Sequence, residues 1–308
     1  MGKQEILKNK FSSLFIIFIC LFNMTACNNT VVHNKGTSEK EKMGGFEFNY
    51  GLPNLSQTPM IHKIKENEDY TASVEVKNHF AEKTDFRLYI FLDNKMANFE
   101  YNKDNVEYID ISLEKGEGKG HTFSIDNITK GRHELIALLV LKPDKSLTNQ
   151  DFIDYVNFSK RFIIIAGEES IETSVNKESI LIDNKKNDKS INATYLTPID
   201  SPNTPDKAIT LINEHKNERR ATLNFWNDSP NKSYTILGLY NNQQIELDQQ
   251  NIVAKNVGQV SIDVNIPIDK ERKTNNIIFL IVENMDSTPD HPSEGILSTN
   301  KITIVSEA

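Results

Sequence analysis

Two stretches of the chain, residues 71–95 and residues 220–244, carry the same order of apolar and polar positions when they are compared without gaps. Each begins with apolar residues at every second position, a spacing that predicts a strand with one buried face. These residues are Ala72, Val74 and Val76 in the first stretch and Ala221, Leu223 and Phe225 in the second. A repeat of this length predicts two copies of one domain, because repeat arrays have shorter units.

The correspondence continues beyond these stretches with small shifts. Leu88 and Ile90 align with Leu237 and Leu239, Phe123 and Ile125 with Val264 and Ile266, residues 135–140 with 277–282, and residues 161–165 with 301–305. Strong and weak strands follow the same order in both halves. We therefore place the first domain at residues 46–166, a linker at 167–189 and the second domain at 190–308.

Each half has about seven short strands separated by turn signals, and neither contains a convincing amphipathic helix. This pattern predicts an all-β fold of two tandem β-sandwiches, each folding as its own unit. It resembles immunoglobulin-like and fibronectin-like modules, although the halves lack an inter-sheet cysteine pair. We expect the cores to be formed by Val74, Val76, Leu88, Ile90, Phe123, Leu139 and Ile163, and by Leu223, Phe225, Leu237, Leu239, Ile262, Ile281 and Ile304.

The amino-terminal end has the features of an export signal. Three lysines and one glutamate lie within residues 1–10, and an apolar run follows over residues 11–22. That run is shorter than the roughly 20 residues that span a bilayer, and its length is typical of a secretory leader. Two small residues, Thr25 and Ala26, then precede Cys27.

Residues 21–27 resemble the lipobox of bacterial lipoproteins, with Met24 at a position that usually holds leucine. The resemblance implies that residues 1–26 are a signal peptide, that Cys27 carries the lipid, and that acyl chains such as palmitate anchor the protein to the cell membrane on its extracytoplasmic face. Each buried methylene contributes about 0.8 kcal/mol, so two or three chains give a durable anchor. Residues 27–45 are mostly polar, and we interpret them as a flexible tether.

Composition excludes several kinds of function. Without residues 1–26 the chain keeps 32 basic and 42 acidic residues, a net charge of −10. An acidic chain without arginine clusters is a poor candidate for binding nucleic acid. The only other cysteine, Cys20, lies in the leader, so the mature chain offers no thiol nucleophile, disulfide or thiolate ligand.

The sequence suggests no catalytic residue, no metal site and no cofactor. Its seven histidines never show the close spacing of metal ligands. Trp226 is the one candidate ligand contact: it takes the place of Lys77 in the repeat, and the alternation that points Phe225 inward points Trp226 away from the core. Packing against the other domain, or a bulge that turns the ring inward, would explain the same residue.

These observations favour a lipid-anchored envelope protein that acts as a non-catalytic binding module for a protein or a glycan. An accessory of envelope assembly, immunity or signalling is an alternative that the sequence does not separate from a binder. The less favoured alternative is an extracytoplasmic hydrolase whose carboxylates converge only in the fold.

Overall fold

The computed structural model describes residues 45–52, 59–145, 157–167, 179–184, 193–202, 204, 208–209, 211–213, 220–267, 269, 271–284 and 294–305. The expected signal peptide, Cys27 and residues 28–44 of the expected tether lie outside these ranges. The fold described below is that of residues 43–308, which form one compact unit. Within the described residues, no helix has the length and apolar character needed to cross a membrane.

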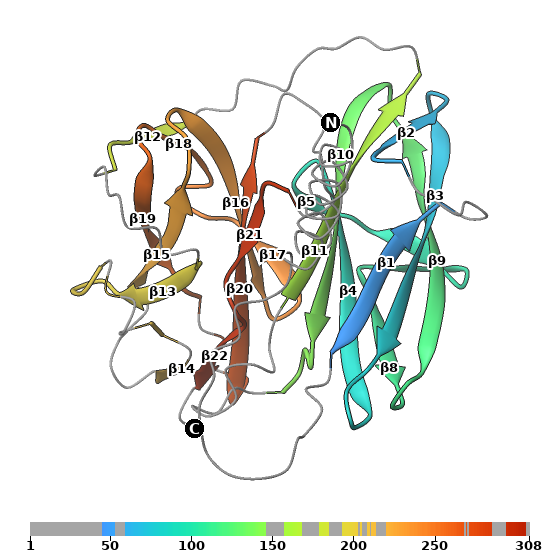
Figure 1. Ribbon diagram of the computed structural model, residues 1–308, viewed down its shortest axis with the longest axis horizontal. Coiled ribbons are helices and arrows are strands. Elements are labelled where there is room, and N and C mark those ends of the chain that lie inside the picture. Colours follow the sequence, from blue (N-terminus) through green and yellow to red (C-terminus); the bar gives the residue numbers. More distant parts are fainter. Residues whose placement is uncertain are drawn as a thin grey trace, which may run out of the picture. The chain divides into compact units, whose positions relative to one another are not determined.

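In the described residues, the first sandwich consists of two sheets with 11 strands (Figure 1). One sheet has the order β1-β3-β9-β6-β7; the other has the order β2-β11-β10-β4-β5, with β8 also paired to β4. The strands are β1 (Phe46–Gly51), β2 (Ile61–Ile64), β3 (Glu68–Asn78), β4 (Thr84–Leu92), β5 (Lys95–Met96), β6 (Phe99–Tyr101), β7 (Asp104–Val106), β8 (Tyr108–Leu113), β9 (Gly118–Ile128), β10 (Gly131–Leu141) and β11 (Asn157–Ala166).

The second sandwich also has two sheets. The larger has the order β12-β18-β16-β20-β22-β14, with β17 paired to β16 and β21 to β20; the smaller has the order β13-β15-β19. The strands are β12 (Ile180–Ile182), β13 (Tyr195–Pro198), β14 (Leu211–Asn213), β15 (Arg220–Asn227), β16 (Lys232–Tyr240), β17 (Gln243–Ile245), β18 (Asn251–Ala254), β19 (Gly258–Asn265), β20 (Thr274–Glu283), β21 (Ile296–Ser298) and β22 (Ile302–Val305).

The two sandwiches share one topology, which confirms the expected fold class of two tandem immunoglobulin-like sandwiches. The strand order β1-β3-β9 corresponds to β13-β15-β19, and β2-β11-β10-β4 corresponds to β14-β22-β20-β16. The β2–β11 and β14–β22 pairs are both parallel. Register agrees as well: Ala72 lies opposite Phe123, and the corresponding Ala221 lies opposite Val264.

Two tight hairpins, which the sequence pattern did not single out, also correspond. Asp93 and Asn94 join β4 to β5, and Asn241 and Asn242 join β16 to β17. All four residues have positive φ, between 47° and 73°. Two successive residues of this kind form the two-residue turn that matches the twist of paired strands, and Asn and Asp tolerate it well.

The sandwiches differ at their sheet edges. In the first, the β6–β7 hairpin covers one side of β9, and the described residues of the second sandwich contain no corresponding hairpin beside β19. In the second, β12 pairs in parallel with β18. Strand β12 lies within residues 167–189, the segment that we expected to be linker.

The expected core positions are buried, but three of them do not face the core of their own sandwich. Leu237 and Leu239 belong to a different cluster from Leu223 and Phe225, and Ile163 lies on the face of β11 opposite Phe162. The connection between β15 and β16 spans 228–231, one residue fewer than 79–83 between β3 and β4. Side chains alternate along a strand. After this one-residue difference, the residues of β16 that the gapless comparison places on the core face therefore lie on the opposite face.

Between the sandwiches lies a third apolar cluster that contains ten buried residues, five from each sandwich. They occupy corresponding positions once the shorter connection is taken into account: Tyr89 with Leu237, Phe91 with Leu239, Ile136 with Ile278, Leu138 with Leu280, and Val140 with Val282. The sheets that contain β10 and β20 thus pack on their own core with one face and on the neighbouring sandwich with the other. This explains why β10 and β20 each contain an unbroken run of apolar residues toward the carboxyl end, since both faces of the strand are buried.

Candidate functional site

Trp226 lies near the end of β15, directly after Phe225, which is fully buried in the core of the second sandwich. The indole is half-buried and lines a cavity of about 230 Å³. The described residues that line this cavity are Ala193, Thr194, Trp226, Asp228, Tyr234, Glu283, Gly295 and Leu297. The candidate ligand contact thus belongs to a concave surface; we call it the Trp226 cavity.

The small side chain of Thr194, which directly precedes β13 in the sequence, helps to make room for this cavity. Gly51 lies opposite Ser73 in the first sandwich, and Thr197 lies opposite Thr222 in the second, so the repeat equates Phe48 with Thr194. Phe48 is buried in the core of the first sandwich. A methyl and a hydroxyl group replace a phenyl ring at this position, which leaves volume that the first sandwich fills.

Charged groups meet at the inner side of the cavity. Lys232 Nζ lies 2.9 Å from Asp228 Oδ1 and 2.9 Å from Glu283 Oε1. Burial raises the pKa of Asp228, but its hydrogen bond with Lys232 and the charge of Lys232 lower it more, so the net shift is downward. Burial likewise lowers the pKa of Lys232, and the two carboxylates raise it above its ordinary value. The Lys232 ammonium is thus shared by two carboxylates, so the cluster has one carboxylate in excess.

A buried asparagine fixes the connection that carries Asp228. Asn227 Nδ2 donates to Ser229 O and to Asn256 O, each at 2.6 Å, and its Oδ1 accepts from Tyr234 at 2.7 Å. In the first sandwich the corresponding Asn78 donates to Glu82 O and Leu113 O. The Tyr234 hydroxyl is thus committed to Asn227, and burial raises its pKa.

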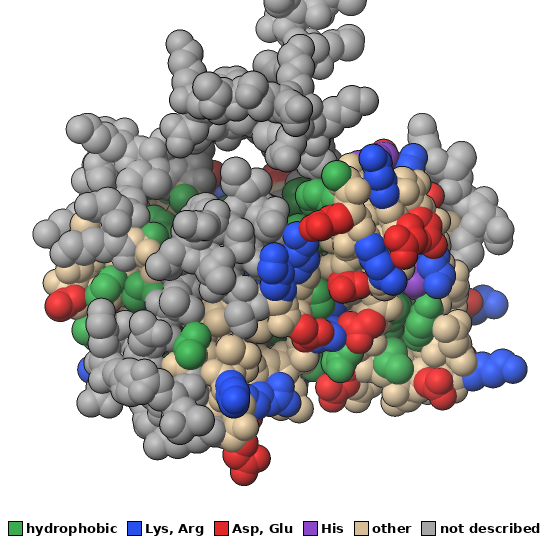
Figure 2. Space-filling model, turned by 90° about the horizontal axis from the view of Figure 1, so that it is seen from below, with side chains coloured by type: hydrophobic (Ala, Val, Ile, Leu, Met, Phe, Trp, Pro, Cys, Tyr) green, Lys and Arg blue, Asp and Glu red, His purple; other side chains and the backbone are tan. Residues whose placement is uncertain are grey.

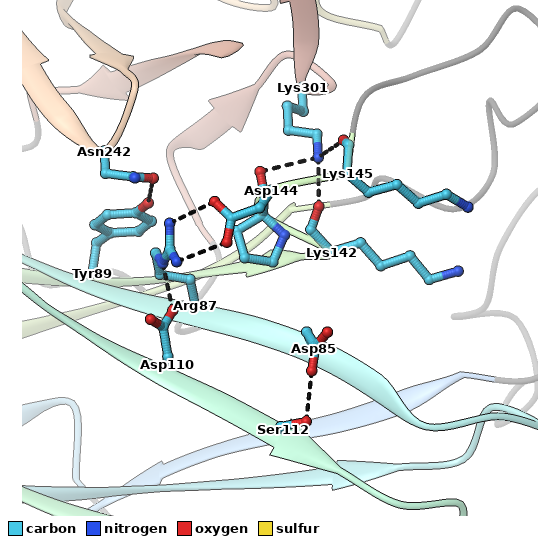
Figure 3. Close-up of polar contacts among 11 residues, drawn as sticks. Asp85, Arg87, Tyr89, Asp110, Ser112, Lys142, Asp144, Lys145, Asn242 and Lys301 are labelled. Carbon is cyan, nitrogen blue, oxygen red and sulfur yellow. Dashed lines mark hydrogen bonds and ion pairs between the residues drawn. The ribbon is translucent and has the colours of Figure 1, made fainter. Parts of the chain in front are cut away.

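A second polar cluster lies where the two sandwiches meet (Figure 3). Arg87 Nε donates to Asp110 at 2.6 Å, and its two terminal nitrogens donate to both oxygens of Asp144 at 3.0 and 3.1 Å. Tyr89 donates to Asn242 at 2.6 Å, a contact that joins the first sandwich to the β16–β17 turn.

Lys301 completes this cluster from the second sandwich. Its ammonium group donates to the carbonyl oxygens of Lys142, Pro143 and Lys145, and burial lowers its pKa to about 8. An adjacent cavity of about 200 Å³ is lined in part by Arg272, Asn276 and Lys301. Because the Arg87 and Lys301 donors already have partners within the chain, this cluster acts as a clamp between the sandwiches.

The described histidines serve separate local roles. His62 bonds to Tyr70 and to the Pro59 carbonyl, His79 to Glu47, His121 to Tyr101, and His133 to Asp93. His33, His215 and His291 lie outside the described residues. Within the described ranges, no three His, Cys, Asp or Glu side chains are grouped so that they could hold a metal ion.

Surface charge is mixed on the face shown in Figure 2. Acidic and basic side chains are interspersed over the first sandwich on that face and do not gather by sign.

No protein-family model and no curated protein matches this sequence. Among solved structures, the chain is similar to the CARDB domain of the PF1109 protein from Pyrococcus furiosus, with 11% identity, 44% of this chain and 99% of that chain covered, and a TM-score of 0.27. It is also similar to the PapD-like domain 7 of human CEP192, with 11% identity, coverages of 46% and 99%, and a TM-score of 0.26.

A further match is a chain from the complex of Zinc 2-glycoprotein and prolactin-inducible protein from human seminal plasma. It has 12% identity, coverages of 42% and 99%, and a TM-score of 0.29. In each of the three, slightly less than half of this chain matches nearly all of the other chain. The strand orders of this chain themselves define its class, a tandem β-sandwich protein.

Proposed function

We propose that this protein is a lipid-anchored binding module of the bacterial cell envelope, held on the extracytoplasmic face through Cys27, and that it binds a protein or glycan partner without catalysis. The observation that carries the binding proposal is the Trp226 cavity. It combines a half-buried indole with two carboxylates on a scaffold whose strands and connections are internally bonded. A rigid sandwich that presents a preformed cavity at one end is suited to recognition.

The anchor is tested by Cys27→Ala. Loss of the lipidated thiol moves the protein from the membrane fraction to the medium or the periplasm. A control with Cys20→Ala keeps the lipobox cysteine and leaves the protein in the membrane fraction. Unchanged membrane retention of Cys27→Ala overturns the anchoring proposal.

The binding surface is tested by affinity capture with the full chain against envelope extract. Trp226→Ala reduces the amount of captured partner at least several-fold, while Lys77→Ala, the corresponding position of the first sandwich, does not. Circular dichroism establishes that both variants keep their strand content. A partner held equally by both variants shows that the binding surface lies elsewhere.

A further inference from the structure

We propose that the Trp226 cavity binds a basic side chain of a partner protein, that is, an ammonium or guanidinium group on an aliphatic stem. This inference rests on the proposed binding function and names the chemistry of the group that is bound. It follows from the charge of the cavity, from its aromatic and apolar walls, and from a comparison with the same place in the first sandwich.

The charge of the cavity favours a cation. Asp228 and Glu283 both line it, and the ammonium group of Lys232 is 2.9 Å from each carboxylate. One positive and two negative groups leave a net charge of −1. The side chain of Asp228 is 68% exposed and that of Glu283 is 19% exposed, so an incoming cation meets one accessible carboxylate and one that is largely shielded from water. Shielding strengthens such a contact because water screens it less.

The walls of the cavity suit a long basic side chain. A cation placed over an indole face is attracted by the ring's electron density, and tryptophan is the best of the aromatic residues in this role. Leu297 and Ala193 supply apolar surface for the methylene groups of the stem. Lysine and arginine both combine an apolar stem with a charged head.

In the first sandwich, the chain itself supplies both the cation and the aromatic ring. There Lys160 Nζ lies 5.5 Å from the centre of the Phe48 ring. Phe48 corresponds to Thr194, and Lys160 to Asn300, because Arg161 aligns with Lys301. The second sandwich thus lacks both the ring and the cation at these positions. It carries Trp226 and two carboxylates instead, and the partner supplies the cation.

A neutral sugar fits this cavity less well. Sugar hydroxyl groups need donors as well as acceptors. The described lining residues offer few side-chain donors, the Thr194 hydroxyl and the Trp226 indole N–H, because the Tyr234 hydroxyl already donates to Asn227. Carboxylates offer acceptors alone once they are ionised. An ammonium or guanidinium group consists entirely of donors and therefore matches the carboxylates of Asp228 and Glu283.

The test uses the emission of Trp226, which is the only tryptophan of the chain. The detergent-purified full chain is titrated with the N-acetyl methylamides of lysine, arginine and norleucine, and with N-acetylglucosamine. We expect a saturable change in emission with lysine and arginine, weakened at high salt. Norleucine, which has a stem of similar length without the charge, binds at least about fivefold more weakly.

Two variants test whether the change in emission depends on the carboxylate of Asp228. Asp228→Asn weakens the lysine response several-fold, and because this side chain is largely exposed the variant keeps the fold. Glu82→Gln, a carboxylate variant in the corresponding connection of the first sandwich, leaves the response unchanged. An equal response to lysine and norleucine, or an Asp228→Asn variant that binds like the parent protein, overturns the inference.

The outcomes also separate this inference from the proposed function. A response to N-acetylglucosamine alone overturns the inference that the cavity binds a basic side chain. The proposed function then stands, with a glycan as the ligand. If no probe changes the emission and Trp226→Ala captures the same partner as the parent protein, both the inference and the Trp226 binding site fall.

Discussion

Arg161 and Lys301 occupy corresponding positions in the two sandwiches, and each is buried with its charged group on the backbone of the other sandwich. Arg161 Nη2 donates to the Glu283 carbonyl at 2.7 Å. Lys301 donates to the Lys142 and Lys145 carbonyls. Reciprocal contacts between corresponding residues are the mark of an isologous interface, the kind that joins two identical subunits. Here the two halves of one chain make it.

Coupled unfolding is the first prediction. Leu138 belongs to the first sandwich and packs in the shared cluster with residues of the second. Leu138→Ala removes buried apolar contacts and costs about 2–5 kcal/mol. Since the two sandwiches share these contacts, the urea midpoint reported by Trp226 emission moves to lower concentration, although Trp226 lies in the other sandwich. A midpoint that stays in place while circular dichroism shows an earlier transition would mean that the sandwiches unfold independently.

Lys301→Met tests the clamp. The change keeps most of the side-chain volume but leaves the buried or partly buried carbonyl oxygens of Lys142, Pro143 and Lys145 without their donor. Each unsatisfied buried group costs about 1–3 kcal/mol. We expect a loss of stability of that size or more in urea denaturation. Lys255→Met is the control: its ammonium group is half-exposed and 3.6 Å from Asp183, so its removal changes stability little.

His121 makes stability depend on pH. Burial, followed by the charge of Lys119, lowers its pKa to about 4 from the ordinary 6.5. Between these values the unfolded chain binds a proton that the folded chain does not, so the His121 contribution to the free energy of unfolding falls as the pH drops from about 6.5 to about 4. His121→Gln removes this part of the dependence. NMR titration checks the premise directly: a His121 pKa near 6.5 in the folded protein would contradict it.

Gly238 provides a double-mutant test of packing between β16 and β17. A Cβ at this position would lie 2.7 Å from Ile245 Cγ1, closer than van der Waals contact allows. Gly238→Ala therefore destabilises the protein, by about 1–3 kcal/mol for an overpacked site. Shortening the neighbour in Ile245→Ala relieves the clash, so the double variant is more stable than the sum of the two single effects predicts. Strict additivity in urea denaturation would show that the clash is not the cause.

The sequence predicted the strands and the repeat because alternation along β3 and β15 reports directly on one buried face. It did not predict which face of β16 turns inward. A shortening of one residue between Asn227 and Lys232 is invisible where both faces are apolar, and β16 is apolar on both because it serves two clusters. The unbroken apolar runs in β10 and β20 were the available signal for a second buried face.

The candidate site was predicted in part. Substitution of Trp226 for Lys77 singled out one residue of the cavity, and alternation predicted a ring directed away from the core. The companions of Trp226 come from four separate parts of the chain, near residues 193, 228, 283 and 296. Their convergence depends on how the strands are arranged in the sheets, which local periodicity does not contain. The clamp around Lys301 could not be predicted for the same reason, because Lys301 and its partners Lys142 and Lys145 are far apart in the sequence.

The shared cluster also bears on the order in which the chain is made. Synthesis completes the first sandwich while β16 and β20 are still missing, so Phe91, Ile136 and Leu138 then form an uncovered apolar face. The same face of another unfinished chain follows the plan of the natural neighbour, so it can pack on this one. Until the second half arrives, pairing of first halves from different chains competes with correct assembly, and a pause in delivery of the chain after residue 166 would favour the wrong pair.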